Sequence, residues 1–356
     1  KRPGVMRLWS YQAIAHGSDS VLFFQMKQSI GGCEKYHGAV ISHAGHGHTR
    51  VFREVEELGR ELEQLGGEIL GSVGTAETAV LFSWENWWAA EYSSGPSIRL
   101  KYEEETLKYY TAFHRQNIPV DIVGQEDDLL KYKLVVAPLL YMVKDGTDSR
   151  IREFVEKGGT FVATYFSGYV DENDLVAIGG YPGKLRDILG IWVEESDALP
   201  EYKTNHFAYQ GQEYPAELLC DIMHLEGAEA LARYQEDFYV GTPVVTRNSF
   251  GDGQAYYVGT RSNDGFYQNF MAELCKEQQI KAAAEAPEGV EAVTRVREEG
   301  KSYLFLLNHG EESQEFTVPN AAKELLTQKE YTKGECFTLP AKGVGIFMGQ
   351  AGHAKE

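Results

Sequence analysis

Apolar residues follow two kinds of pattern along this chain, and their alternation predicts the fold class. From about Ala79 onward, short runs of consecutive apolar residues are separated by stretches with apolar residues at helical spacing. The runs predict strands over Val80–Phe82, Val120–Val123, Lys133–Ala137 and Thr160–Thr164, and the helical stretches cover Tyr102–Gln116, Ser149–Lys157 and Phe266–Lys276. Strands that alternate with helices are typical of a parallel sheet covered on both faces. We therefore predict an α/β domain over residues 78–282.

The second half of this region has a less regular pattern. A helix is predicted over Leu185–Leu189, and Pro243–Thr246 with Gln254–Val258 resembles a hairpin-like pair of strands. The run Ala216–Met223 is ambiguous, because a short apolar run fits a buried strand as well as a buried helix.

The first 67 residues predict a helix, a strand and a second helix. Met6–His16 has helical spacing, and Val21–Phe24 is a candidate strand buried on both faces because its apolar residues are consecutive. Thr49 can cap a helix whose apolar positions recur as far as Leu65. Strand, loop and helix form one repeat of a parallel α/β structure, in which ligands bind at the loop after the strand. Two helices cannot cover both faces of one strand, so we expect residues 1–67 to need further structure for stability.

Two linkers and a small β domain are predicted in the remaining sequence. Glycine-rich residues between Gly66 and Gly74 and the stretch Ala283–Gly289 have the composition of linkers. Four short β-like runs follow, at Val290–Val296, Ser302–Asn308, Glu315–Val318 and Gly343–Met348. This spacing predicts a small antiparallel sandwich over residues 289–349. Gln350–Glu356 is a polar tail that we expect to be mobile.

Charge and cysteine usage narrow the class of protein. The 356 residues carry a net charge of −19, from 53 acidic and 34 basic side chains. This balance argues against nucleic acid or an anionic membrane surface as the main partner. No apolar run approaches the roughly 20 residues of a membrane helix, and no signal-peptide pattern opens the sequence. The four cysteines (Cys33, Cys220, Cys275 and Cys336) have no paired spacing, which indicates reduced thiols in a cytoplasmic protein. We place Cys220 and Cys275 in helices, where buried, unreactive thiols are usual.

The loop between Gly31 and Arg50 concentrates the polar chemistry of the first segment. It holds one Glu, four His, one Cys and five Gly. A carboxylate accepts hydrogen bonds from hydroxyls and an imidazole donates or accepts, so Glu34 and His37 suit a polyol. The four histidines with Cys33 could instead bind a transition metal. No second cysteine lies near in sequence, and we favour a ligand-binding loop with incidental histidines, without a metal or other cofactor.

Several motifs resemble one known family. The segments Gly4–Asp19, Phe24–Ser29 and Glu34–Ala39 are similar to the last part of the catalytic barrel of the glycoside hydrolase family 42 β-galactosidases. The similarity continues through Trp84–Ala89 and Leu134–Pro138 to the C-terminus. It therefore covers nearly the whole chain.

The resemblance implies a fold and a function. The fold would be the C-terminal remnant of a TIM barrel, then a flavodoxin-like or glutamine-amidotransferase-like parallel α/β trimerisation domain, then the β-sandwich. Glu34 and His37 would bind galactose hydroxyls in a retaining hydrolase of terminal β-galactosides. Such enzymes need two carboxylates about 5–5.5 Å apart. In the family both lie earlier than the segment matched here, so we assign no catalytic residue and expect this chain alone to be inactive. The alternative is a non-catalytic homotrimer-forming or carbohydrate-binding unit.

Three further motifs leave open questions. Met26–Lys27 replaces the Trp-Arg that is usual in the family, which either alters substrate preference or reflects packing beneath the barrel. Trp84–Trp88 contains three tryptophans, which favours a subunit interface or pocket wall over plain packing. Ser167 is the nearest candidate nucleophile of the central domain, but its flanking residues do not have the Gly-x-Ser-x-Gly spacing of a nucleophile elbow. No P-loop or dinucleotide-binding glycine motif occurs.

Overall fold

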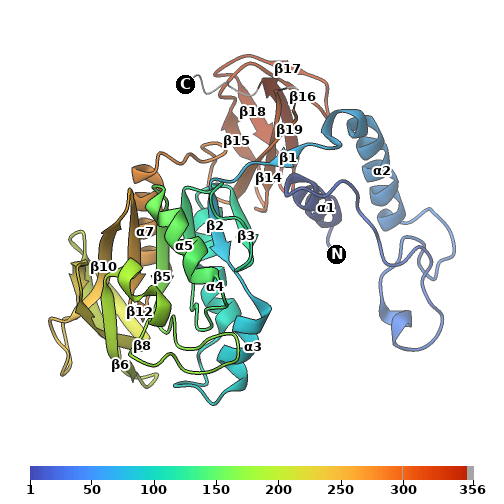
Figure 1. Ribbon diagram of the computed structural model, residues 1–356. Coiled ribbons are helices and arrows are strands. Elements are labelled where there is room, and N and C mark those ends of the chain that lie inside the picture. The colour runs from blue at the N-terminus through green and yellow to red at the C-terminus, as the bar shows by residue number, and fades with distance from the viewer. Residues whose placement is uncertain (299, 351–356) are drawn as a thin grey trace. The chain divides into compact units, whose positions relative to one another are not determined.

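The computed structural model describes residues 1–298 and 300–350 (Figure 1). Of the polar tail predicted over Gln350–Glu356, Gln350 is the last residue of strand β19 (Val344–Gln350), and the rest lies outside the described residues. The chain divides into two compact units, which we call the composite unit (Lys1–Thr75 with Ala282–Glu356) and the central unit (Ala76–Lys281). No helix in the described part of the chain combines the length and apolar character that crossing a bilayer requires.

Both helices expected at the start of the composite unit are present. Helix α1 (Val5–Ala15) buries Leu8, Tyr11 and Ile14. Helix α2 (Arg50–Ile69) is capped by Thr49, whose side chain accepts from the Phe52 amide. The helix continues through the glycines that we predicted as the start of a linker. Each glycine costs about 1 kcal/mol in a helix, and burial of Leu65 and Ile69 offsets that cost at about 1.5–3 kcal/mol each.

The prediction of a strand over Val21–Phe24 is wrong. These residues form no strand, and the Leu22 side chain is 92% exposed. A strand of a parallel sheet needs neighbours on both edges and cover on both faces. Among the described residues this segment has neither, so its backbone stays irregular.

The C-terminal part of the composite unit is a small antiparallel sandwich, as predicted. Its larger sheet has the strand order β1-β13-β14-β19-β16-β17, and a β15–β18 pair forms the second sheet. The strands are β1 (Val73–Gly74), β13 (Val290–Val296), β14 (Lys301–Asn308), β15 (Gln314–Thr317), β16 (Ala322–Glu324), β17 (Glu330–Tyr331), β18 (Cys336–Leu339) and β19 (Val344–Gln350). Side chains of β14 alternate between two cores: Tyr303 and Phe305 pack with α1 and α2, whereas Leu306 faces the β15–β18 pair.

The central unit contains the predicted α/β layers. Its seven-stranded sheet has the order β3-β2-β4-β5-β11-β10-β9, parallel from β3 to β11 and antiparallel after it. The strands are β2 (Thr78–Leu81), β3 (Val120–Val123), β4 (Leu134–Ala137), β5 (Thr160–Thr164), β9 (Glu229–Arg233), β10 (Pro243–Phe250) and β11 (Gly253–Val258). Helices α4 (Tyr102–His114) and α7 (Asp264–Glu277) cover one face, and α5 (Thr147–Glu156) and α6 (Arg186–Leu189) cover the other. The hairpin-like pair is confirmed as β10 and β11.

A second antiparallel sheet in this unit corrects one assignment. Its strands are β6 (Ile191–Ala198), β7 (Asn205–Tyr209), β8 (Gln212–Leu225) and β12 (Thr260–Arg261). Cys220 lies in β8 and not in a helix, whereas Cys275 lies in α7 as expected. All residues from Leu218 to Met223 are buried, so this strand lacks the alternation that would have identified it.

Candidate sugar-binding loop

Backbone hydrogen bonds close the neck of the loop that carries Glu34 and His37. The Val40 amide donates to Gln25 O at 2.9 Å, and the Ile41 amide donates to Met26 O at 2.8 Å. The Gln28 amide returns a bond to Ile41 O at 3.0 Å. The loop is therefore tied at its base without belonging to a sheet.

The Gln28 side chain holds the interior of the loop. Its Nε2 donates to Lys35 O at 3.0 Å and to His37 O at 2.9 Å, while its Oε1 accepts from the His43 amide at 3.0 Å. Within the loop, a short 3₁₀ helix, η1 (Cys33–Tyr36), ends where the His37 amide donates to Glu34 O. The amide group of Gln28 thus fixes the C-terminal end of this turn and ties it to His43.

Glu34 and His37 both project from this turn with exposed side chains. Ser29 Oγ donates to Glu34 Oε2 at 3.1 Å, and the His37 ring meets the edge of Phe24 with 5.9 Å between ring centroids. The turn places the two residues on one short segment, but each side chain has its own neighbours. An exposed carboxylate can accept hydrogen bonds from the hydroxyls of a ligand, and an exposed imidazole can donate one or accept one.

The other histidines of the loop have local contacts. His43 Nε2 lies 2.8 Å from Ser29 O, and the rings of His46 and His48 are 5.4 Å apart. Cys33 is exposed. Within residues 1–298 and 300–350, no three or more His, Cys, Asp or Glu side chains are grouped to hold a metal ion.

An apolar hollow of about 480 Å³ adjoins the neck of the loop. It lies among α1, the segment predicted as a strand, and the start of α2, and includes Trp9, Phe23, Val40 and Val55. Gln25 also lines it, and the Nε2 of that side chain is buried with no hydrogen-bond partner among the described residues. Met26 and Lys27, next along the chain, are exposed, so packing beneath a barrel floor is not visible within this chain.

In the central unit, the candidate nucleophile Ser167 is fully buried and its hydroxyl is engaged. Ser167 Oγ accepts from the Leu140 amide at 3.0 Å, next to Leu139, whose amide donates to Thr164 Oγ1 at 2.8 Å. Burial raises the pKa of the Cys220 thiol to about 11 and that of Cys275 to about 12. Both thiols are therefore protonated at neutral pH, and these three side chains have structural roles.

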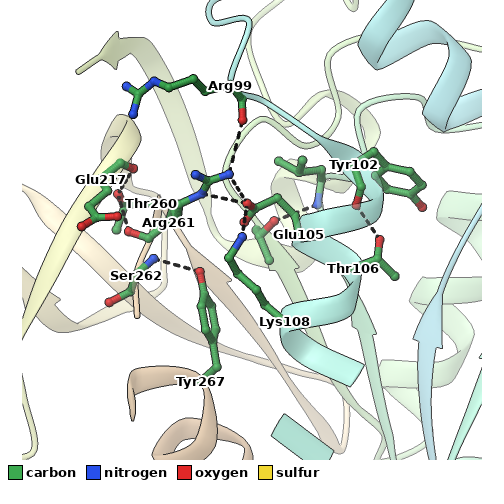
Figure 2. A network of polar contacts seen from close by, with 12 residues as sticks. Arg99, Tyr102, Glu105, Thr106, Lys108, Glu217, Thr260, Arg261, Ser262 and Tyr267 are labelled. Carbon is green, nitrogen blue, oxygen red and sulfur yellow. Dashed lines mark hydrogen bonds and ion pairs between the residues drawn. The ribbon is translucent and has the colours of Figure 1, made fainter. Parts of the chain in front are cut away.

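Sequence reasoning missed a buried ionic network in the central unit (Figure 2). Glu105 of α4 accepts from Arg261 Nε at 2.7 Å and from Lys108 Nζ at 2.5 Å. Its other oxygen, Oε2, is buried without a hydrogen-bond partner in the described chain, as is Tyr165 Oη. Burial lowers the pKa of the Arg261 guanidinium, but the negative charge of Glu105 outweighs this and raises it overall. The network joins α4 to β12, which lie 156 residues apart, so no local motif could have revealed it.

Comparisons with known proteins match most of the chain in three parts. The β-galactosidase trimerisation domain family matches residues 76–281, more than half of the chain, the β-galactosidase family matches 1–65, and the β-galactosidase C-terminal domain family matches 289–347. β-Galactosidase BgaP of Planococcus sp. strain L4 is 48% identical over 352 residues, and BgaB of Geobacillus sp. strain Y412MC61 is 45% identical over 349. Both alignments cover 97% of this chain, but only 52% and 51% of those proteins.

Solved structures give the same result. The β-galactosidase from Bacillus circulans sp. alkalophilus superposes with a TM-score of 0.95 at 52% identity, covering 98% of this chain and 52% of the other. The cold-adapted enzyme from Rahnella sp. R3 gives 0.91 at 43% identity, with the same coverage. The chain spans about half the length of the relatives it matches, and it belongs to the glycoside hydrolase family 42 β-galactosidases.

Proposed function

We propose that this chain is the sugar-binding and assembly part of a retaining β-galactosidase that hydrolyses terminal non-reducing β-D-galactosides. One observation carries the proposal: the loop with Glu34 and His37 falls inside residues 1–65, which the β-galactosidase family matches. Relatives named β-galactosidases align with 97% of the chain, the loop included.

Glu34 and His37 would bind the galactose. Both side chains are exposed, and Gln28 fixes the turn that carries them, so they need little ordering when a sugar binds. Glu34 would accept from two neighbouring sugar hydroxyls, and His37 would donate to or accept from a third. Hydrogen bonds to a charged group contribute about 1.5–3 kcal/mol each, enough to orient the ring at the reacting bond.

The nucleophile and the acid/base would come from residues outside this chain. A retaining glycosidase holds them about 5–5.5 Å apart across the scissile bond. The half of each relative that this chain does not match has room for both groups. The same missing part would cover the apolar hollow beside α1 and supply an acceptor for Gln25 Nε2.

We also propose that three copies associate through the central unit and that the protein works in the cytoplasm. The trimer is supported by the family match over residues 76–281. The cytoplasm is supported by two exposed thiols, Cys33 and Cys336, which remain unpaired in the described chain.

Complementation tests the catalytic part of this proposal. The 356-residue chain is purified, assayed on a chromogenic β-galactoside, and assayed again after mixing with the half of the Planococcus enzyme that it does not match. We expect turnover only in the mixture. Turnover by the chain alone, after removal of host galactosidase, would show that its own residues carry the chemistry.

Variants of the mixture test the two site residues. Glu34→Gln and His37→Ala are each expected to lower kcat/KM by about 10- to 100-fold, in line with the loss of a charged or strong hydrogen bond. Glu57→Gln, an exposed position on α2, is the matched control and should leave kcat/KM unchanged. If the mixture neither turns over substrate nor binds galactose, the non-catalytic assembly alternative is favoured.

A further inference from the structure

Helix α3 (Trp84–Tyr92) and the residues after it leave large apolar side chains uncovered. The side chains of Trp84 and Trp88 are 57% and 52% exposed, and those of Tyr92 and Ile98 are each 87% exposed. Polar residues are the usual choice on the outer face of a surface helix. Here the outer face carries two tryptophans instead.

A second segment of the central unit extends this surface. The loop after β5 exposes Leu175 and Ile178. Ala90 of α3 and Val170, at the start of this loop, belong to the same buried cluster as Tyr141, so the two segments lie close together. Figure 1 likewise shows the yellow-green loop reaching toward α3. We call the surface formed by Trp84, Trp88, Tyr92, Ile98, Leu175 and Ile178 the α3 face.

The tryptophans of the α3 face are held in place before any partner binds. Ser83 caps the helix, and the fully buried Asn86 side chain donates to Leu139 O at 2.9 Å and accepts from the Met142 amide at 2.7 Å. Trp84 stacks on Trp87 with ring centroids 5.4 Å apart, and Trp87 Nε1 donates to Glu91. Rigid aromatic side chains lose little entropy on binding, which makes them effective anchors of protein interfaces.

The size of the α3 face indicates what covers it. Three of these six side chains are aromatic, and an aromatic residue has roughly 150–250 Å² to bury. Together with the three aliphatic side chains, and at their exposed fractions, they present on the order of 800 Å². The largest apolar patch of a typical monomer is about 300–600 Å², whereas one partner in a standard protein interface contributes about 800 Å². A single sugar ring would cover only a fraction of such a surface. Charged groups lie at its margin, where Lys144 pairs with Glu85, as expected of an interface rim.

From this we infer that the α3 face is the contact surface for a second copy of this chain. The inference rests on the proposed trimer and locates it. In a closed ring of three copies each interface joins two different surfaces, so the α3 face of one copy meets another part of the central unit of the next. Truncating its anchors therefore weakens every interface of the ring.

The test compares the self-association of variants of the 356-residue chain by light scattering over a range of concentrations. Trp84→Gln with Trp88→Gln is expected to weaken trimer formation by about 100-fold or more, as for truncation of central anchor residues. Trp88→Glu, which places a charge in the contact, should act in the same direction. Leu107→Gln is the matched control, because Leu107 is 49% exposed on α4 outside the α3 face. Circular dichroism verifies that each variant is folded.

The outcomes separate this inference from the proposal it rests on. A trimeric parent with monomeric tryptophan variants and a trimeric control supports the α3 face. A parent that is trimeric and tryptophan variants that associate equally tightly would overturn the α3 face and leave the trimer standing. A parent that is monomeric at every concentration would overturn the trimer itself, and the α3 face with it.

Discussion

The loop around Glu34 and the interior of the central unit use polar side chains in opposite ways. In the loop, Glu34 and His37 are exposed, and the turn that carries them is fixed by hydrogen bonds from Gln28, only a few residues away. In the central unit, Glu105 and Asp221 are buried, and apart from Lys108 their side-chain partners come from distant parts of the chain. Order in the loop is therefore local, and its candidate binding groups are exposed. Order in the central unit is shared among many segments, so the loss of a buried polar side chain there removes contacts from several of them.

The same small change should have very different effects in the two regions. At Gly253, in β11, an added Cβ would lie 2.2 Å from Val155 O and 2.3 Å from Gly159 O, whereas at Gly38, in the loop, it would meet nothing within 4 Å. Neither backbone has a positive φ, so the contacts alone decide. Gly253→Ala must displace the β5–β11 pairing or α5, and we expect a loss of about 3 kcal/mol or more of unfolding free energy.

Urea unfolding followed by far-ultraviolet circular dichroism measures this difference, because that signal comes from the helices and strands of both units. Protein concentration is kept constant because association changes the midpoint. Gly38→Ala should leave the midpoint within error. A similar midpoint for both variants would mean that the close packing at Gly253 relaxes without cost.

Removal of one carboxylate from each region gives the next largest contrast. Glu105→Ala leaves the mostly buried Arg261 without its counter-ion, and breaking a buried ion pair in this way costs about 3–5 kcal/mol. Glu34→Ala removes only a single bond from Ser29 at an exposed position, and its effect on stability should be within about 0.5 kcal/mol.

Scanning calorimetry of the two variants measures this contrast, with Glu103→Ala as a control on the exposed side of α4. We expect a clearly lower transition temperature for Glu105→Ala alone. A transition temperature for Glu105→Ala equal to that of Glu103→Ala would indicate that water replaces Glu105 as the partner of Arg261.

The two regions also differ in how much the sequence could predict. Residues such as Val80, Val136 and Val162 lie in short apolar runs whose neighbours are all within this chain, so the parallel sheet and its helices were predicted correctly. The pattern of Val21–Phe24 is the same, but the strands that would flank it are not among the described residues, and the prediction failed. The β8 strand was missed because Leu218–Met223 are buried on both faces. Local pattern therefore gives the type of an element only where the partners of that element are present and its two faces differ in burial.

The functional residues show the same limit. Glu34 and His37 were found through a family motif, and their role as galactose ligands stays a prediction. The pairing of Glu105 with Arg261 joins residues far apart in sequence. Each of them stands among polar residues in the sequence, where an exposed side chain is the usual expectation. The exposure of Trp84 and Trp88 likewise depends on how α3 is anchored by Asn86, which a run of three tryptophans does not disclose.

The smallest predicted effect concerns Asp221, which is fully buried in the central unit. Its Oδ2 accepts from the Phe166 amide at 3.1 Å and from Tyr257 Oη at 2.7 Å, and its Oδ1 accepts from Ser196 Oγ at 2.5 Å. Burial raises the pKa of this carboxyl above 3.8, although the three hydrogen bonds oppose the rise. The folded state therefore binds this proton more tightly than the unfolded state, so the contribution of Asp221 to stability is greatest at low pH. It is lost as the pH rises through the folded-state pKa.

Asp221→Asn should remove that loss. Rotated so that its oxygen faces Phe166 and Tyr257, the amide of Asn keeps those two bonds and donates to Ser196 Oγ, which can accept. We expect the variant to have a higher free energy of unfolding than the parent near pH 8, with the difference shrinking as the pH falls, because burial raises the pKa of the Asp221 carboxyl. Thermal unfolding at several pH values measures it, and Asp252→Asn, at an exposed position, should show no such trend. A variant less stable than the parent at pH 8 would mean that the central unit needs the carboxylate ionised. A buried, ionised carboxylate would then stabilise the central unit. The two regions would differ only in whether the charged side chain is buried or exposed.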